Sequence, residues 1–313
     1  MPELPVLSTD PQELLLLLLA DIRHLLPFNQ FTASLLEGGI ESIVAKIASY
    51  DGRVIVVKFA PNRFTGNAND PDLDFLDLYR QELEIANECA AHDIPTCRID
   101  EVFVSPLGVP AMIMGHVDHD RSSPSGASLG LLTRALHNMP TRRETTVAMR
   151  GMSAAEMLTR LTLERLQVVA GRTGRVVWTP GAQELLTILQ PLDDNSSLLH
   201  MDLRSANVLC AEGKPLALID WDNAVVANSL LEIARVMEYD LLDGGFIRAY
   251  GNESVMAGLK TATGLACRLY TAAMMAVLFL CEIPDEQLAW ERMARLEAVL
   301  TDLRRAIGTG SAK

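Results

Sequence analysis

The chain has 313 residues, 49% of them hydrophobic, which is enough for one large or two small domains with a sizeable core. Its 27 basic and 40 acidic residues give a formal charge of 27 − 40 = −13. That charge argues against nucleic acid as a partner, because phosphate backbones are bound by basic faces. An acidic surface favours a cationic small substrate, although many proteins are acidic only for solubility.

Cysteine usage and the apolar runs bear on where the protein is found. Five cysteines occur, an odd number without the CxxC spacing of metal sites, which is typical of reduced thiols in the cytoplasm. The chain starts Met1-Pro2-Glu3, whereas a signal peptide starts with basic residues. The apolar runs 14–20 and 271–281 are far shorter than the roughly 20 residues that cross a bilayer. We therefore expect a cytoplasmic protein without a membrane segment.

The first part of the chain is expected to be rich in strands. β-branched residues fill 54–59, and the Asp51-Gly52 pair before them is typical of a tight hairpin turn. Apolar residues at helical spacing among charged ones indicate a helix over 74–91. In chain order we expect a helix at 11–26, strands at 43–48 and 54–59, the helix at 74–91, and a strand at 109–114.

The second part of the chain is expected to be mainly helical, with a short strand pair. Residues 118–128 (DHDRSSPSGAS) are polar and contain Pro and Gly, which makes them the best linker candidate. The sequence therefore predicts an α+β protein in two parts. Residues 1–116 would hold an N-terminal helix, an antiparallel sheet and one helix, and residues 117–313 would form the helical part.

Asp202 is the first candidate for a chemical role. Residues 200–207 read HMDLRSAN, and 216–222 read LALIDWD. On a loop that leaves a short buried strand, the Asp202 carboxylate can accept a hydrogen bond from a substrate hydroxyl and take its proton. The alternative is an ordinary Asp that caps a turn. An Asp followed five places on by Asn is common by chance, and the Ile-Asp-Trp further on makes the pattern specific.

Asn207 and Asp220 are candidate ligands of a metal ion. Mg²⁺ prefers oxygen donors and takes only one or two from protein, the rest coming from phosphates and water. Asp220 ends an apolar run, where a carboxylate is costly unless a cation or several donors meet it. Coordination of Mg²⁺ against nucleotide phosphates explains both residues.

Three neighbours of these residues have open roles. His200 is expected to hold the loop by packing and hydrogen bonding rather than to act as acid or base. Arg204 either reaches a transferred phosphate or pairs with a carboxylate as a surface residue. Asp222 either assists a second metal ion or caps the next segment.

Four segments upstream of residues 200–222 resemble motifs of the aminoglycoside phosphotransferase and choline kinase family and occur in the same order as in that family. Members of this family are small-molecule relatives of the protein kinases. The likeness spans about residues 33–240 and extends the match of 200–222 to the catalytic and metal loops of that family. The upstream segments are 37–42 (EGGIES), the strand that carries Lys58, 80–84 (RQELE) with 90–95 (AAHDIP), and 129–140 (LGLLTRALHNMP).

The resemblance implies a two-lobed protein-kinase-like fold with ATP and Mg²⁺ between the lobes. Lys58 would hold the nucleotide phosphates, with Glu82 as its ion-pair partner and Glu84 as the fallback. A hinge at Met114 to His116 would offer backbone groups to adenine. The turn residues that would approach the phosphates are Gly38, Gly39 and Ser42.

Two departures from the family pattern concern the catalytic loop. Glu232 stands where the family has an Asp that braces this loop, and Arg204 stands where His is common. Residues 139–198 and those beyond 243, the segments that select the acceptor in the family, match no particular subfamily.

We expect an ATP- and Mg²⁺-dependent transfer of the γ-phosphoryl group to a hydroxyl of a small molecule, cationic ones such as an aminoglycoside or amino-alcohol included. Asp202 and Arg204 would act on the acceptor, and Asn207 and Asp220 would hold the metal. A protein kinase is the nearest alternative, but the nine residues between Asp222 and Glu232 are too few for a regulatory activation loop. A non-catalytic nucleotide-binding pseudokinase is the other. The sequence makes no prediction of oligomeric state.

Overall fold

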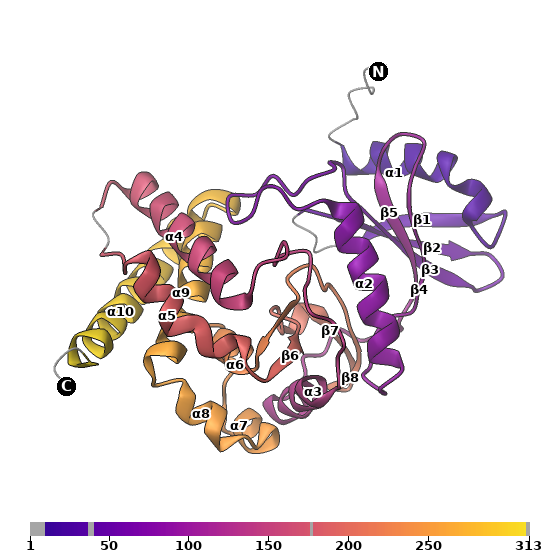
Figure 1. The fold of residues 1–313 in the computed structure, drawn as a ribbon. Helices are drawn as coiled ribbons and strands as arrows, with labels where there is room; N and C mark the ends of the chain where they lie inside the picture. The colour runs from indigo at the N-terminus through magenta and orange to yellow at the C-terminus, as the bar shows by residue number, and fades with distance from the viewer. Residues whose placement is uncertain (1–9, 37–40, 176–177, 311–313) are drawn as a thin grey trace. The chain divides into compact units, whose positions relative to one another are not determined.

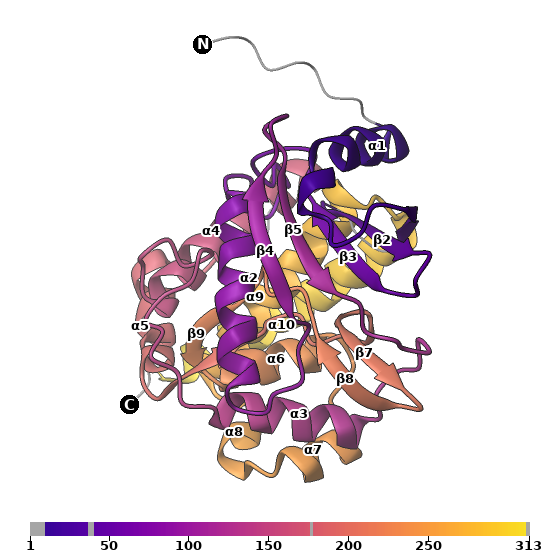
Figure 2. The same cartoon turned by 90° about the vertical axis from the view of Figure 1, so that its right-hand side faces the viewer.

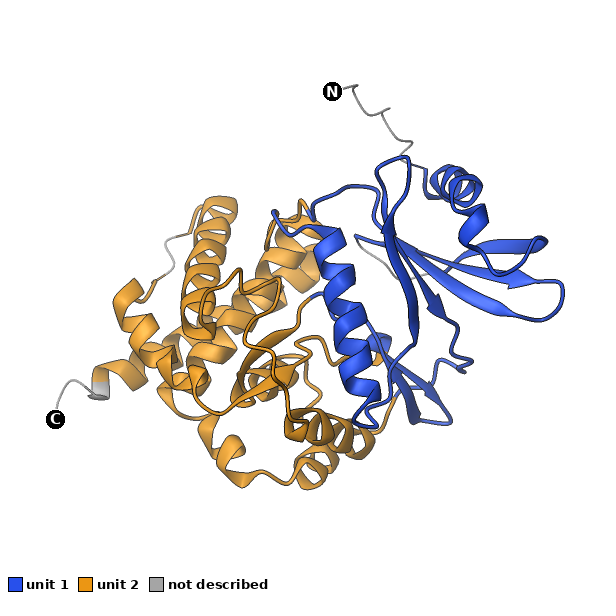
Figure 3. Cartoon of the chain, turned by 45° about the vertical axis from the view of Figure 1, so that its right-hand side comes forward, with its two compact units in different colours: residues 1–65, 72–123, 206–222 blue, residues 66–71, 124–205, 223–313 orange. Residues whose placement is uncertain are grey.

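The computed structural model describes residues 10–36, 41–175 and 178–310, which form two compact units (Figure 3). Unit 1 comprises residues 1–65, 72–123 and 206–222, and unit 2 comprises 66–71, 124–205 and 223–313. This division differs from the expected single boundary after residue 116, because the 206–222 hairpin joins the first unit. The Leu218 amide donates to the Pro95 carbonyl at 2.9 Å and fixes that hairpin there.

Unit 1 is built on an antiparallel sheet of five strands in the order β1-β2-β3-β5-β4 (Figure 1). The hairpin between β2 and β3 turns at Gly52, whose φ of +90° favours glycine. This confirms the expected fold class at its N-terminal end. The elements of the unit are α1 (Pro11–Asp21), η1 (Arg23–Leu25), β1 (Phe31–Leu36), β2 (Ile43–Ser49), β3 (Val54–Phe59), α2 (Phe75–Ala90), β4 (Ile99–Val104), β5 (Pro110–Gly115), η3 (Ser205–Asn207), β7 (Val208–Ala211) and β8 (Lys214–Leu218).

The two faces of this sheet have different partners. Leucines of α1 pack with alternate residues of β2, β3 and β5, Val57 and Phe59 among them, in one apolar cluster. Side chains alternate along a strand, so Lys58 points to the opposite face. Figure 2 shows α2 alongside β4 and β5, and α2 buries Tyr79 and Glu82. The alternation of β3 therefore directs one lysine away from the apolar cluster.

Unit 2 is mainly helical, with α9 at its centre. Nearly all of α9 is buried, and its apolar cluster includes residues of α4 and α10. The elements are α3 (Gly126–Asn138), α4 (Ala154–Thr173), α5 (Ala182–Leu189), η2 (Gln190–Asp193), β6 (Ser196–Leu199), β9 (Val225–Asn228), α6 (Leu230–Glu238), α7 (Gly244–Tyr250), α8 (Glu253–Gly258), α9 (Ala262–Val277), the π-helix η4 (Leu278–Glu282) and α10 (Glu286–Gly310).

One segment of unit 2, Ala262–Glu282, is long and apolar enough to cross a membrane by length and composition alone. Of its most apolar window, 78% is buried inside the protein. A helix that packs its apolar surface against neighbouring helices is the ordinary centre of a helical domain.

The expected elements are present, with shifts at their ends. The helix expected at 74–91 is α2, which begins after Asp74, whose side chain accepts from the Leu76 amide. The linker expected at 118–128 is shorter than predicted, because α3 begins at Gly126. Ser125 caps α3 by accepting from the Ser128 amide at 3.1 Å. A polar Ser- and Gly-rich run is typical both of a linker and of a helix start, and here its end is the start of a helix.

Candidate active site

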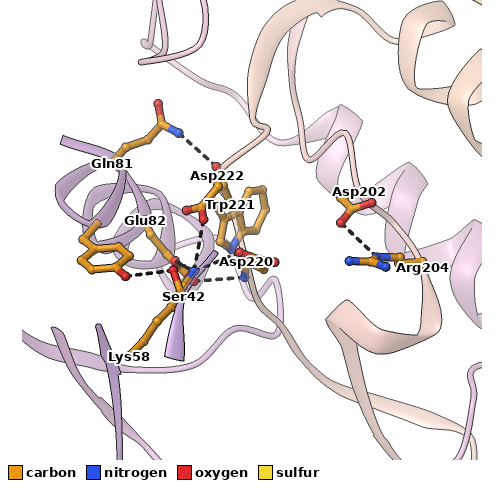
Figure 4. A network of polar contacts seen from close by, with 10 residues as sticks. Ser42, Lys58, Gln81, Glu82, Asp202, Arg204, Asp220, Trp221 and Asp222 are labelled. Carbon is orange, nitrogen blue, oxygen red and sulfur yellow. Dashed lines mark hydrogen bonds and ion pairs between the residues drawn. The ribbon is translucent and has the colours of Figure 1, made fainter. Parts of the chain in front are cut away.

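Lys58 lies at the centre of a cluster of carboxylates in unit 1 (Figure 4). Its Nζ donates to Glu82 Oε2 at 3.0 Å, to Asp220 Oδ1 at 2.9 Å and to Asp222 Oδ2 at 3.4 Å. The expected pair of Lys58 and Glu82 is therefore present, whereas Glu84, the fallback partner, is exposed. The pair fixes the ammonium group at one point of the sheet.

The segment 220–222 owes its position to buried contacts. The Trp221 side chain is completely buried, and its carbonyl accepts from Gln81 Nε2 at 3.0 Å. The Asp220 amide donates to Glu82 Oε1 at 3.1 Å, with a φ of +69° at Asp220. Left-handed backbone at a residue other than glycine is uncommon and concentrates at functional sites.

Burial and charge act against each other in this cluster. Burial lowers the pKa of Lys58, but Asp220, Asp222 and Glu82 outweigh it and hold that pKa well above the ordinary 10.5. Burial raises the pKa of Asp222 well above 3.8, and the neighbouring carboxylates add to the rise against the attraction of Lys58. With all three carboxylates ionised, they and the one ammonium have a formal charge of −3 + 1 = −2. A divalent cation would balance that charge.

The donor set fits Mg²⁺. Ligand atoms of Glu82, Asp220 and Asp222 all lie within 4.8 Å of one another, and Mg²⁺ prefers such hard oxygen donors. The Asn207 carbonyl accepts from the Ile219 amide at 3.0 Å, which places Asn207 across the hairpin from the residue before Asp220. Asp220 remains the predicted ligand together with Asn207, and the structure adds Asp222 to the same group.

Ser42, whose predicted approach to the nucleotide stays a prediction, contacts the tyrosine beside Lys58. Its Oγ lies 2.9 Å from the Tyr79 hydroxyl, and the Lys58 ammonium stands 5.4 Å from the centre of the Tyr79 ring. Burial raises the pKa of Tyr79, so its hydroxyl stays neutral. Tyr79 thus contacts the lysine through its ring, and Ser42 contacts Tyr79 through its hydroxyl.

Of the two residues that bound the predicted hinge, Met114 lies inside β5 and His116 lies just after its end. Met114 lies within the sheet, opposite Val56 on one side and Ile99 on the other. The register places it on the sheet face that carries Lys58. His116 follows the strand, half-buried, with its pKa lowered by burial and by Lys46.

The predicted phosphate turn lies outside the described residues. Gly38 and Gly39 belong to this segment, 37–40. Their assignment to the nucleotide stays a prediction.

Asp202 in unit 2 is surrounded by donors. Its Oδ1 accepts from the Tyr239 hydroxyl at 2.9 Å, and its Oδ2 accepts from Arg204 Nε at 3.1 Å. Arg235 Nη2 lies 3.9 Å from Oδ1. The Asp202 amide donates to His200 Nδ1 at 3.1 Å, the supporting position predicted for that histidine. Arg204 thus pairs with the carboxylate, which was the second of its two predicted roles.

Glu232 on α6 braces the loop that carries Asp202. Its carboxylate accepts from the amides of His200 and Met201 and from His137 Nε2 at 2.8 Å. Met201 has a φ of +63°, unusual for a residue other than glycine. The Tyr250 hydroxyl lies 2.9 Å from His137 Nδ1 and extends the chain of contacts. Glu232 therefore does the bracing predicted for it.

We expect Glu232→Gln to lower the free energy of unfolding by about 1.5–3 kcal/mol near neutral pH, the usual worth of hydrogen bonds to a charged group. Burial raises the pKa of Glu232, but hydrogen bonds from His137 and the Met201 amide outweigh it and hold that pKa below 4.5. A lowered pKa stabilises the fold above the unfolded-state value and loses that effect as the pH falls through the folded one. The difference between the two proteins should therefore shrink below pH 4.5.

Urea unfolding at about pH 7 and about pH 4 measures this difference. The matched control is Glu184→Gln, at an exposed residue of α5. A difference that stays constant across this pH range would contradict the assigned role of the Glu232 charge.

Tyr239 and Arg235 are contacts of Asp202 that sequence reasoning missed. The two are four residues apart at the end of α6, and Arg235 Nε donates to the Tyr239 hydroxyl at 3.0 Å. Their helical spacing is visible in the sequence. Their contact with a residue more than 30 positions away depends on how α6 packs.

A sequence model of the phosphotransferase enzyme family matches residues 35–261. The chain therefore belongs to the phosphotransferase enzyme family. No curated protein matches the chain significantly.

Solved structures of similar fold include three phosphotransferases. A thermostable mutant of aminoglycoside phosphotransferase APH(4)-Ia, in ternary complex with AMP-PNP and hygromycin B, has 13% identity and a TM-score of 0.59 over 91% of this chain and 98% of that one. The Plasmodium vivax ethanolamine kinase has 13% identity and a TM-score of 0.60 over 95% and 90%. The GDP complex of an aminoglycoside 2'-phosphotransferase-IIIa mutant has 12% identity and a TM-score of 0.61 over 92% and 97%. These likenesses confirm the kinase-like α+β fold.

Proposed function

We propose that the protein transfers the γ-phosphoryl group of ATP to a hydroxyl of a small molecule, with Mg²⁺ as cofactor. The observation that carries the proposal is the Lys58 cluster, in which an ammonium and three carboxylates meet within a member of the phosphotransferase family. Similar folds have been solved with AMP-PNP and hygromycin B, or are an ethanolamine kinase, which supports a nucleotide donor and a small acceptor.

In the proposed reaction the bond between the γ-phosphorus and the bridging oxygen of ATP breaks, and a bond from the acceptor oxygen to phosphorus forms. Asp202 accepts the hydroxyl proton, and ADP carries away the bridging oxygen. Lys58, fixed by Glu82, holds the donor phosphates as a positive point charge. Asp220, Asp222 and Asn207 would hold Mg²⁺, which neutralises charge on the phosphates when bound.

The buried and the exposed contacts of Asp202 have different proposed roles. Tyr239 is tied to Arg235, and Arg235 is 3% exposed, so these two hold the carboxylate in one orientation. The Arg204 side chain is 48% exposed and is the contact that an incoming hydroxyl can displace. We infer that Arg204 releases Asp202 Oδ2 when the acceptor binds, and that it then binds the transferred γ-phosphoryl group.

We also propose that the protein acts in the cytoplasm. All five cysteines lie in the described part of the chain, and all are free thiols. A reducing compartment keeps thiols in that state.

Purified protein incubated with ATP, Mg²⁺ and a panel of amino-alcohols, aminoglycosides, macrolides and sugars should release ADP with at least one acceptor, and removal of Mg²⁺ with EDTA should stop the release. Coupled detection of ADP measures this. ATP binding without acceptor-dependent ADP release anywhere in the panel would favour a pseudokinase. Phosphorylation of protein substrates alone would favour a protein kinase.

A further inference from the structure

The end of α6 carries the tyrosine that contacts Asp202, directly after a buried glutamate. The Tyr239 hydroxyl donates to Asp202 Oδ1 at 2.9 Å. Glu238, the last residue of α6, is 2% exposed. A carboxylate buried this deeply is costly unless cations or other donors meet it. The groups that hold Glu238 therefore bear on where the Tyr239 hydroxyl lies.

Two arginines from other helices of unit 2 bind the Glu238 carboxylate. Arg268 of α9 donates from Nε to Glu238 Oε1 at 2.7 Å. Arg295 of α10 donates from Nε to Oε2 at 2.7 Å and from Nη2 to Oε1 at 3.1 Å, the bidentate geometry that guanidinium and carboxylate groups favour. Both carboxylate oxygens are thus engaged, and α9 and α10 together fix the glutamate.

The backbone at the end of α6 is fixed as well. Arg292 Nη1 donates to the Glu238 carbonyl at 3.2 Å. The Leu241 amide donates to the Val236 carbonyl at 3.1 Å, the long bond of a Schellman cap. Asp240 has a φ of +58°, the left-handed conformation that this cap requires and that residues other than glycine seldom adopt. The chain is therefore held immediately before and after the tyrosine.

The pattern of α10 explains how its arginines reach this glutamate. Leu296 and other apolar residues of α10 pack in one cluster with residues of α9. Arg292 and Arg295 are three positions apart, so they lie on one face of α10. These two residues and Arg268 all lie beyond residue 261, where the match to the family model ends. The support for the tyrosine thus comes from a part of the chain that the family model does not cover.

We propose that Glu238 is a positioning residue for the proposed base, Asp202, and acts on it through Tyr239. This rests on the proposed function. Because Arg268 and Arg295 hold Glu238, α9 and α10 contribute to the reaction without touching a reactant. A displaced hydroxyl on Tyr239 would let the Asp202 carboxylate turn away from the acceptor, and a misplacement of about 1 Å can cost about 10²-fold in rate.

Steady-state ADP release by single variants tests the positioning role. We expect Glu238→Gln to lower kcat by about 10–10²-fold and to leave the KM for ATP unchanged, because the phosphates are assigned to Lys58. Arg295→Met should lower kcat less, since the Arg295 side chain is 38% exposed and Arg268 remains. Arg295→Lys keeps the charge and should recover part of that loss. If Glu238→Gln does not fold, Arg295→Met takes its place in each comparison below.

Double variants distinguish an effect through Tyr239 from a general loss of structure. Tyr239→Phe removes the hydroxyl that contacts Asp202, so adding Glu238→Gln to it should lower kcat little further. The matched control is Arg305→Met, which removes an exposed ion pair with Asp302 on α10. It should turn over as the wild type does and should not couple to Tyr239→Phe. Losses of kcat that multiply in the double variant, or a raised KM for ATP in Glu238→Gln, would overturn the proposal.

Urea unfolding of the same variants needs no turnover. We expect Tyr239→Phe to cost less stability in the Glu238→Gln background than in the wild type, because the hydroxyl has already lost its position there. An equal cost in both backgrounds would overturn the link between Glu238 and Tyr239. Coupling in unfolding, without ADP release by the wild type from any acceptor, would refute the proposed reaction and leave Glu238 as the residue that positions Tyr239 beside Asp202.

Discussion

Replacing the proposed base, Asp202→Asn, should lower kcat by about 10²–10⁴-fold, the usual contribution of a general base. The amide keeps one oxygen to accept from Tyr239, so the loop should keep its shape, but it cannot take the acceptor's proton. ATP affinity should be unchanged, because the phosphates are assigned to Lys58. Steady-state ADP release and nucleotide titration measure the two effects separately.

The matched control for Asp202→Asn is Asp194→Asn, at an exposed residue before β6. It should turn over as the wild type does. Full turnover of Asp202→Asn would show that another group accepts the proton. Loss of ATP affinity together with turnover would show that Asp202 acts on the nucleotide rather than on the acceptor.

Replacing the proposed phosphate-binding lysine, Lys58→Met, should reduce both activity and stability. Removal of one charge that stabilises a transition state costs about 10²–10³-fold in kcat. The ammonium also compensates carboxylates that are buried or half-buried, and breaking a buried pair costs about 3–5 kcal/mol. Urea unfolding and ATP titration measure the two effects.

A double variant separates the two roles of Lys58. Lys58→Met with Glu82→Gln removes the uncompensated buried charge, so stability should partly return while activity stays lost. Lys214→Met replaces an exposed lysine on β8 of the same unit and should change neither. Unchanged ATP affinity in Lys58→Met would refute the assignment of Lys58 to the phosphates.

Much of the fold followed from local patterns in the sequence. The β-branched run of β3, the Asp51-Gly52 turn and the helical spacing of α2 specify those elements through short-range geometry. The pair of Lys58 and Glu82 was reached through family resemblance, and the structure contains it. The start of α3 was predicted to be part of a linker, because a polar run such as the one around Ser125 is typical both of a linker and of a helix start.

Contacts between distant segments were beyond sequence patterns. Asp222 had two predicted roles, and the burial of Trp221 places it beside Lys58. Tyr239 reaches Asp202 because α6 packs where it does, and periodicity gives a helix its apolar face but not its neighbours. Arg204 also had two predicted roles, and its ion pair with Asp202 follows from the shape of the loop.

The sequence by itself determined the family, the order of the elements and the identity of the candidate polar residues, because these depend on residue type, spacing and short-range geometry. Only the tertiary structure decided which charges face one another. Net charge sums the whole chain to −13, whereas a ligand responds to the few charges within about 10 Å, the screening length in salt solution. Around Asp202 those include Arg204 and Arg235.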